Sequence, residues 1–544
     1  MHTTGADARN HRSLLKAALG LTGAALVALT GCTSDSAAQG SGAGGATPRP
    51  GGTLTFALGD EVRCIDPQQA GDGAELTAAR GLVDSLTVRD PGTGRLGPWL
   101  ATSWQASANA ESFTFTLRPG VTFSDGTALT ATAVKAALDG DVALGARAIL
   151  ASGYLTGYKE SAVLAPDKVR VDFSKPNAKF LDATSTVSLG IVAPATSAKS
   201  ADQRCAGGIV GSGPFVLSSF TRDQQVTETA RKGYTWAASG SAHQGPAYLD
   251  RIVFKIVTED GVRLGGLQSS QFAGISDLTS QDRQALTGGG ATVLSRAIPG
   301  LATSINVNTS RPFISDRTVR LALASAVDRS QIIAALGPGY SAATSVLSST
   351  TTDYTDLRSR LATDAAAASK SLDGDGWVRG GDGIRVKNGV RLQLTVVWFG
   401  EDPVTQSALE LVQQQFKAIG VGLTLHPVPT SGALAAFKSG DYDLVVGDSS
   451  NADPDILRIY YTAEGLNAVR LSAGPLQTAL FAQSTQADPA KRAALVSQAQ
   501  QQLIGDGYAI PLFEQSSAVA LSTSVHGVAL DTVAHPLFYD AWLS

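Results

Sequence analysis

The sequence reads LATSW at residues 100–104 and FTFTLRPGVTFSDGT at residues 113–127. Apolar and polar residues alternate over Phe113–Leu117, which is the pattern of a half-buried β-strand. The turn formers of Arg118–Gly120 lead into a second apolar run, Val121–Phe123. Two such runs joined by a short turn predict a β-hairpin.

Strand and helix patterns alternate on both sides of this stretch. Thr130 can cap a helix that carries Val134 and Leu138 on its apolar face. Apolar periodicity predicts strands at 54–58, 169–173, 252–256, 392–396 and 421–425, a long helix from Asp316 to Ile333, and helices over 404–419 and 489–504. It also predicts a short buried strand at 444–446, a loop at 447–454 and an extended segment at 508–513. This alternation indicates an α/β protein.

The composition limits the class of protein further. With 544 residues, of which 43% are hydrophobic, the chain can form a packed core of about three structural units. The formal net charge is -4 and no basic patch stands out, so we expect no nucleic-acid partner. Outside the N-terminal region, no apolar stretch reaches the length of a membrane-spanning helix.

The N-terminal region has the organisation of an exported lipoprotein. Basic residues precede an apolar stretch from Ala17 to Leu29, which is too short to span a membrane and suits a secretory signal. The stretch ends in Leu29-Thr30-Gly31-Cys32, which resembles the lipobox of bacterial lipoproteins. We therefore predict a signal peptide at 1–31, a lipidated N-terminus at Cys32 and a flexible tether at 32–50. An ordinary signal peptide that happens to end beside a Cys is the alternative.

Two further cysteines, Cys64 and Cys205, remain after this signal. In an exported chain an even pair is most simply joined as a disulfide. Two buried free thiols are the alternative.

Several blocks of the sequence resemble the family 5 extracellular solute-binding proteins, the peptide- and nickel-type receptors of ABC importers. The stretches 100–104 and 113–127 are similar to the most diagnostic segment of that family. The remaining blocks follow in family order at 211–215, 308–313 with Asp316, 319–322, 326–329, 440–444, 453–454 and 510–512. Together they cover essentially all of residues 51–530.

The resemblance implies an α/β, two-lobed periplasmic-binding-protein-like fold with a discontinuous lobe I and an interlobe ligand cleft. Closure of such a cleft is a hinge motion. The expected parts are 51–85 (first part of lobe I), 86–190 (a subdomain of lobe I), 191–295 (second part of lobe I), 296–508 (lobe II) and 509–544 (the C-terminal return to lobe I).

The sequence departs from the family pattern at the site. Peptide-binding members often carry a Trp seven residues and an Asp four residues before the Pro of an Asp-Pro or Glu-Pro dipeptide, and that Asp pairs with the α-amino group of the peptide. Counting back from Pro454 gives Gly447 and Ser450. The sequence thus lacks, at residue 450, the carboxylate that would pair with a peptide N-terminus. Asp448 or Asp453 could substitute, unless Asp453 is a structural cap.

Other candidate residues follow predicted strands. Trp398 and Phe399 are either cleft residues or core, and Asp60 and Glu61 either meet a cationic group or solvate a loop. The predicted ligand-binding residues are Asp60, Glu61, Ser212, Trp398, Phe399, Gly447, Asp448, Ser449, Ser450, Asn451 and Asp453.

Signatures of catalysis and metal binding are missing from the sequence. It has no Gly-x-Ser-x-Gly elbow, no His-Glu-x-x-His helix and no phosphate loop, so we expect no enzyme. Its histidines are scattered, so we expect no metal site, and no cofactor is expected. A hydrolase built from distant Ser, His and Asp residues is the remaining enzymatic alternative.

We therefore expect a substrate-binding lipoprotein of an ABC importer that captures a small organic solute, most simply a short peptide, and delivers it to a membrane permease. The expected partners are that solute, the ABC permease and the membrane, the last through the lipid anchor, and the chain is expected to be a monomer. It would be exported and anchored to the outer face of the cytoplasmic membrane, on the periplasmic side where an outer membrane is present. A lipoprotein of the same fold that senses or sequesters a signal is the alternative.

Overall fold

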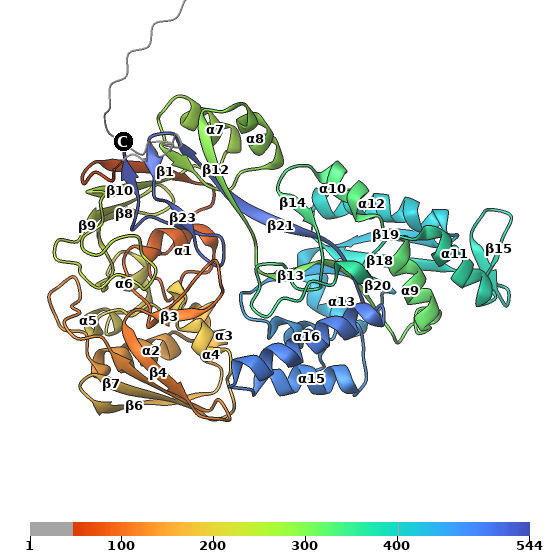
Figure 1. Cartoon of the computed structure of the whole chain (residues 1–544), viewed down its shortest axis with the longest axis horizontal. Helices are drawn as coiled ribbons and strands as arrows, with labels where there is room; N and C mark the ends of the chain where they lie inside the picture. The colour runs from red at the N-terminus through yellow and green to blue at the C-terminus, as the bar shows by residue number, and fades with distance from the viewer. Residues whose placement is uncertain (1–46, 401) are drawn as a thin grey trace, which may run out of the picture. The chain divides into compact units, whose positions relative to one another are not determined.

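The computed structural model describes residues 47–400 and 402–544 (Figure 1). Residues 48–544 form one compact unit of mixed helices and strands, which confirms the predicted α/β class. Among the described residues, no helix has the length and apolar character needed to cross a membrane. The predicted signal peptide and Cys32 lie outside the described residues, as does most of the predicted tether.

One mixed sheet of twelve strands runs through the unit. The order along its main path is β19-β18-β20-β13-β21-β11-β1-β10-β9-β8, and β12 and β14 also pair with β21. The strands are β1 (Thr53–Leu58), β8 (Phe215–Thr221), β9 (Gln225–Ala230), β10 (Arg251–Ile256), β11 (Gly274–Ile275), β12 (Ala291–Ala297), β13 (Gly300–Val307), β14 (Tyr340–Ala342), β18 (Gln393–Phe399), β19 (Gly422–Val428), β20 (Leu444–Ser450) and β21 (Ala509–Ser522).

The two ends of this sheet belong to different hydrophobic cores. The end with β1 and β10 packs around Phe56 and Phe254, and we call this part lobe I. The end with β18 and β20 packs around Trp398 on one side and Tyr460 on the other, and we call this part lobe II. Each lobe therefore has its own buried apolar interior.

Strand β21 runs from one lobe into the other, with β12 paired to its lobe I half and β13 to its lobe II half, and we call these three the hinge strands (Figure 1). β12 and β13 follow each other along β21 in antiparallel pairing. Ile510 and Leu512 of β21 pack in lobe II, whereas Val519 and Leu521 pack in lobe I. Within β21 the packing therefore changes from the core of lobe II to the core of lobe I.

A separate antiparallel sheet of order β4-β5-β7-β6 lies within residues 86–190. The predicted hairpin after β5 is wrong, because β5 pairs with β4 and β7 instead. Thr127 donates to Asp125 in a tight turn, so the second apolar run folds back on itself and forms a single bridge, from Thr122 to Ala128. The strands of this sheet and of the small pairs are β4 (Ala101–Ala106), β5 (Ser112–Leu117), β6 (Tyr158–Ala165), β7 (Lys168–Phe173), β2 (Thr87–Arg89), β3 (Leu96–Pro98), β15 (Val378–Arg379), β16 (Arg385–Lys387), β17 (Val390–Arg391), β22 (Val525–His526), β23 (Ala529–Leu530), β24 (Pro536–Leu537) and β25 (Trp542–Leu543).

Capping residues set where the helices begin. The Thr130 hydroxyl accepts a hydrogen bond from the backbone of Ala133 and caps α2 as predicted. The predicted long helix from Asp316 to Ile333 is two helices, because Val327 is extended and Asp328 caps a new helix. The helices are α1 (Gly73–Arg80), α2 (Ala131–Leu144), α3 (Ala151–Tyr154), α4 (Phe180–Ala183), α5 (Pro194–Ser197), α6 (Ala201–Cys205), α7 (Asp260–Gln268), α8 (Ser280–Ala285), α9 (Arg317–Ala326), α10 (Arg329–Leu336), α11 (Ala365–Gly374), α12 (Pro403–Ala418), α13 (Ala433–Ser439), α14 (Ile456–Tyr461), α15 (Pro475–Ser484) and α16 (Pro489–Gly505).

Candidate functional site

The strand β20 is longer than predicted and includes half of the predicted loop. Residues 447–450 belong to it, although Gly, Asp and Ser are poor strand formers, because antiparallel pairing with β13 continues as far as Ser450 opposite Gly300. The parallel ladder with β18 ends at Val445. In the described part of the chain, the edge of β20 that faces β18 therefore has no strand partner from residue 446 onward.

Polar side chains follow this open edge. The Thr303 hydroxyl donates a hydrogen bond of 2.8 Å to the Asp448 carboxylate. Asp448 is exposed, but partial loss of water around its carboxylate raises its pKa, and the charge of Asp402 adds to the rise. Ser450, at the end of the strand, is exposed. The arrangement offers a solute one carboxylate that is already hydrogen-bonded and one free hydroxyl group.

Gly447 lies against the hydroxyl group of Tyr460. A Cβ atom at residue 447 would come within 2.5 Å of the Tyr460 hydroxyl oxygen, so only glycine fits here without a shift. Tyr460 is buried, and its hydroxyl has no hydrogen-bond partner among the described residues. Burial raises the pKa of Tyr460 well above its usual value. Tyr460 was not predicted from the sequence, because it lies on α14, beyond the predicted loop.

The two aromatic candidates at the end of β18 differ in their surroundings. Trp398 is 4% exposed and packs in the core of lobe II, which is the second of the two alternatives considered for it. Phe399 is half-buried, and its ring centre lies 5.1 Å from that of Phe437. Of the pair, Phe399 is therefore the one that reaches the surface of the lobe.

Asp453 is held by an arginine. Two hydrogen bonds of 2.9 and 2.6 Å join its carboxylate to the guanidinium of Arg492, and it also accepts the backbone N–H of Asp455. Burial alone would raise the pKa of Asp453, but attraction to Arg492 outweighs it and the pKa is lowered. The Asn451 side-chain oxygen in turn accepts the backbone N–H of Asp453. Asp453 thus serves the fold, and its carboxylate is not free for a solute amine.

Arg492 also reaches across to the other part of the protein. Its Nη1 atom lies 3.5 Å from Asp182 of α4, and Asp182 pairs with Arg89 of β2. Asp353 lies close to the same charges, and burial raises its pKa to about 6. We call Arg89, Asp182, Asp353, Asp453 and Arg492 the interlobe ion cluster. It was missed in the sequence because its members are far apart along the chain.

The predicted residues of lobe I lie at the surface or in the core. Glu61 is exposed and pairs with Arg63. Asp60 is exposed, and partial burial together with Asp277 and Asp72 raises its pKa. Ser212 is fully buried, and its hydroxyl accepts a hydrogen bond from the backbone of Asp84. Ser212 is therefore a structural residue in this conformation.

The predicted disulfide between Cys64 and Cys205 is present. The same two segments are joined by a hydrogen bond from the Ile65 backbone N–H to the Cys205 carbonyl oxygen and by the buried ion pair of Arg204 with Asp66. These contacts attach α6 to the segment that leads from β1 to α1.

The predicted residues thus form two groups. Those from lobe II gather at the ends of β18 and β20, whereas Asp60, Glu61 and Ser212 belong to lobe I. Among the described residues, no hydrogen bond or ion pair joins the groups, and no cluster of His, Cys, Asp or Glu could hold a metal ion. Two surface hollows of about 430 and 470 Å³ are lined by none of the predicted residues.

Most of the chain matches a known protein family. Residues 95–467 match the family described as bacterial extracellular solute-binding proteins, family 5 Middle. The chain belongs to this family. The chain is therefore an exported solute-binding protein of the peptide and nickel type, the type that serves ABC importers.

Relatives of this family 5 protein include the oligopeptide-binding protein OppA of Mycobacterium tuberculosis, which is 24% identical over 508 residues covering 88% of this chain and 83% of the relative. The glutathione-binding protein GsiB of Salmonella typhimurium is 26% identical over 377 residues, or 68% of each chain. NikA from Brucella suis, in complex with Fe(III)-EDTA, superposes with a TM-score of 0.76 at 22% identity and covers 91% of this chain and 100% of its own. The unliganded open form of the murein tripeptide binding protein MppA superposes with a TM-score of 0.75 at 18% identity. The match covers 90% of this chain and 97% of MppA. These likenesses confirm the predicted two-lobed fold.

Proposed function

We propose that this family 5 protein is the lipid-anchored receptor of an ABC importer and captures a short peptide between its lobes. The observation that carries the proposal is the open edge of β20 beyond Val445. An extended peptide can add to such an edge as a further strand, with main-chain hydrogen bonds that do not depend on its sequence. The names of two relatives, which bind an oligopeptide and glutathione, support this class of solute.

The side chains at this edge favour a solute whose binding does not require a charged amino group. Ser449, Ser450 and Asn451 offer neutral hydrogen bonds, each worth about 0.5–1.5 kcal/mol. Asp453 is neutralised by Arg492, so it cannot take the place of a carboxylate at residue 450. Asp448 is the one carboxylate at the edge, and one of its oxygens already accepts a hydrogen bond from the Thr303 hydroxyl. We therefore propose an uncharged or cationic peptide, held mainly through its backbone.

Acetylation of the peptide N-terminus is expected to weaken binding by less than about tenfold, or ~1.4 kcal/mol. Titration calorimetry with trialanine and N-acetyl-trialanine measures this difference directly. Ser450→Asp should create a preference for the free amine, because a charge-assisted hydrogen bond contributes about 1.5–3 kcal/mol. Ser407→Asp, on the exposed face of α12, is the matched control and should create none. A larger loss on acetylation in the wild-type protein would show that another acid, such as Asp448, captures the amine, and no binding of either peptide would refute a peptide receptor.

The lipid anchor at Cys32 is expected to hold the protein on the membrane. Each buried methylene of an acyl chain contributes ~0.8 kcal/mol, so two or more chains anchor stably. Cys32→Ser should therefore move the protein from the membrane fraction to the soluble fraction, whereas Thr33→Ser should leave it in place. Immunoblotting of the two fractions measures this. If Cys32→Ser stayed on the membrane at the wild-type level, the anchor would have to be somewhere else.

A further inference from the structure

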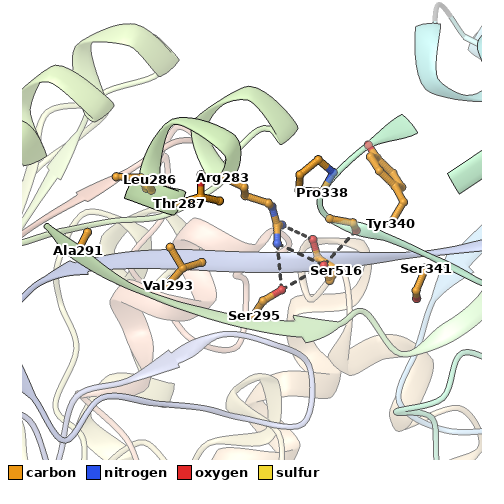
Figure 2. Close-up of a pocket in the computed structure, with 11 residues that line it drawn as sticks. Arg283, Leu286, Thr287, Ala291, Val293, Ser295, Pro338, Tyr340, Ser341 and Ser516 are labelled. Atoms are coloured by element: carbon orange, nitrogen blue, oxygen red, sulfur yellow. Dashed lines mark hydrogen bonds between the residues drawn. The ribbon is translucent and has the colours of Figure 1, made fainter. Parts of the chain in front are cut away.

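A hollow of about 430 Å³ lies beside the hinge strands, and we call it the hinge pocket (Figure 2). Arg283 of α8 and Val293 of β12 line it from lobe I, and Tyr340 and Ser341 of β14 line it from lobe II. Ser516 of β21 lies between them. This volume is within the range of small-molecule sites, and none of the predicted peptide-binding residues contributes to it.

Arg283 is a buried cation without an acidic partner. It is 9% exposed. Its Nη1 donates to the Ser295 hydroxyl at 2.9 Å, and its Nη2 donates to the Ser516 carbonyl oxygen at 2.6 Å (Figure 2). All its hydrogen-bond acceptors in the described chain are neutral, and no described Asp or Glu forms an ion pair with it. A buried charge that is not balanced by an opposite charge is costly, so an anion bound here would gain a strong partner.

The rest of the lining suits a small anion that has a carbon skeleton. The hydroxyl groups of Tyr340 and Ser341 accept or donate no hydrogen bond within the described chain, so they can donate to a ligand. Leu286 and Val293 supply apolar surface, and Val293 is 38% exposed. Burial raises the pKa of Tyr340, and the charge of Asp402, which does not line the pocket, raises it further. No described acidic side chain lines the pocket itself.

We infer that the hinge pocket binds a small organic carboxylate, with its carboxylate group on Arg283 and with the Tyr340 and Ser341 hydroxyls as further donors. Such a ligand would contact both lobes, so its affinity would depend on the angle between them. By thermodynamic linkage, the carboxylate would change the affinity of the protein for the imported solute by some factor. The solute would change the affinity for the carboxylate by the same factor. The pocket is thus a second, regulatory site of the receptor.

Succinate is the first probe, with acetate and inorganic phosphate as further arms. The full-length exported chain, made soluble by Cys32→Ser, is titrated by calorimetry and by urea unfolding at constant ionic strength. In the Cys32→Ser protein the urea midpoint of unfolding should rise with succinate concentration and then level off. Arg283→Gln should lower the affinity for succinate by more than tenfold. The matched control is Arg317→Gln. Arg317 lines the second hollow, of about 470 Å³, but is paired with Asp506 at 2.9 Å, so its loss should leave the response unchanged.

A second variant keeps the test decisive if Arg283→Gln folds poorly. Val293→Trp fills the pocket but leaves Arg283 in place, and because Val293 is partly exposed the variant should fold normally and still lose the succinate response. The inference is overturned if succinate neither binds nor raises the midpoint of the parent protein. It is equally overturned if Arg283→Gln or Val293→Trp responds as the parent does, or if phosphate binds while both carboxylates do not.

Discussion

Replacing Cys64 and Cys205 by serine is expected to lower the free energy of unfolding by about 4–5 kcal/mol in the chain-entropy view. The disulfide closes a loop over a sequence separation of 141 residues, so breaking it gives the unfolded chain many more conformations. The native contacts between the same segments do not depend on the bond. The Arg204–Asp66 ion pair and the backbone hydrogen bond from Ile65 remain to hold α6 in place. The double variant should therefore fold, but with lower stability.

Urea unfolding of the wild-type and doubly substituted proteins measures this loss. Ala206→Ser, at an exposed position next to Cys205, is the matched control and should unfold like the wild-type protein. Alkylation provides a separate check on the bond. After unfolding without a reductant, neither Cys64 nor Cys205 of the wild-type protein should react. Modification of both would mean that the two thiols are free, and then the serine variant should lose little stability.

The sequence predicted the strands of the fold well wherever one face of a strand is buried. Phe113 and Phe115 of β5 alternate with threonines because one face of their sheet packs against a core, and Ile252 and Phe254 of β10 are buried at the same spacing in the other sheet. The errors occur where distant contacts override local preference. The polar end of β20 is a strand only because β13 pairs with it, and the helix after Asp316 breaks because Asp328 offers a second cap.

The site was predictable only where a local motif points to it. The Asp-Pro dipeptide at Asp453 directed attention to β20, and two cysteines in an exported chain indicated their bond. Arg492 could not be found in this way, because it lies 39 residues from Asp453 and 310 residues from Asp182, which it also contacts. The hydroxyl of Tyr460 was missed for a similar reason. Nothing in the sequence around Tyr460 shows that its hydroxyl lies against Gly447, which is on a different element and leaves space because it has no Cβ atom.

Arg492→Leu is expected to lower the free energy of unfolding by about 3–5 kcal/mol at neutral pH, because it leaves a buried carboxylate without its partner. Asp453 is 5% exposed and accepts two hydrogen bonds from Arg492. Asp182 loses a cation as well, although Arg89 still pairs with it. The contact between Arg492 and Asp182 joins lobe II to α4, so a motion that moves lobe II away from α4 also breaks this contact.

The stability that Arg492→Leu loses should depend on pH, and the direction of this dependence tests whether the Asp453 carboxylate is the cause. In the wild-type protein the pKa of Asp453 is lowered, so its contribution to stability is present above the unfolded pKa of about 3.9 and is lost as the pH falls. Without Arg492, burial instead raises this pKa, so the variant loses stability as the pH rises. The difference between the two proteins should therefore be small near pH 3 and grow toward pH 7.

Urea unfolding at several pH values tests this, with two further variants for comparison. Arg358→Leu removes an arginine whose side chain is 73% exposed and paired with Asp356, and it should change stability only slightly at any pH. Adding Asp453→Leu to Arg492→Leu removes the stranded carboxylate and should restore much of the stability, since replacing both partners of a buried pair by apolar residues is often close to neutral. If the double variant were less stable than Arg492→Leu alone, or if the loss were the same at pH 3 and pH 7, the stability would come from the packing of the Arg492 side chain and not from its charge.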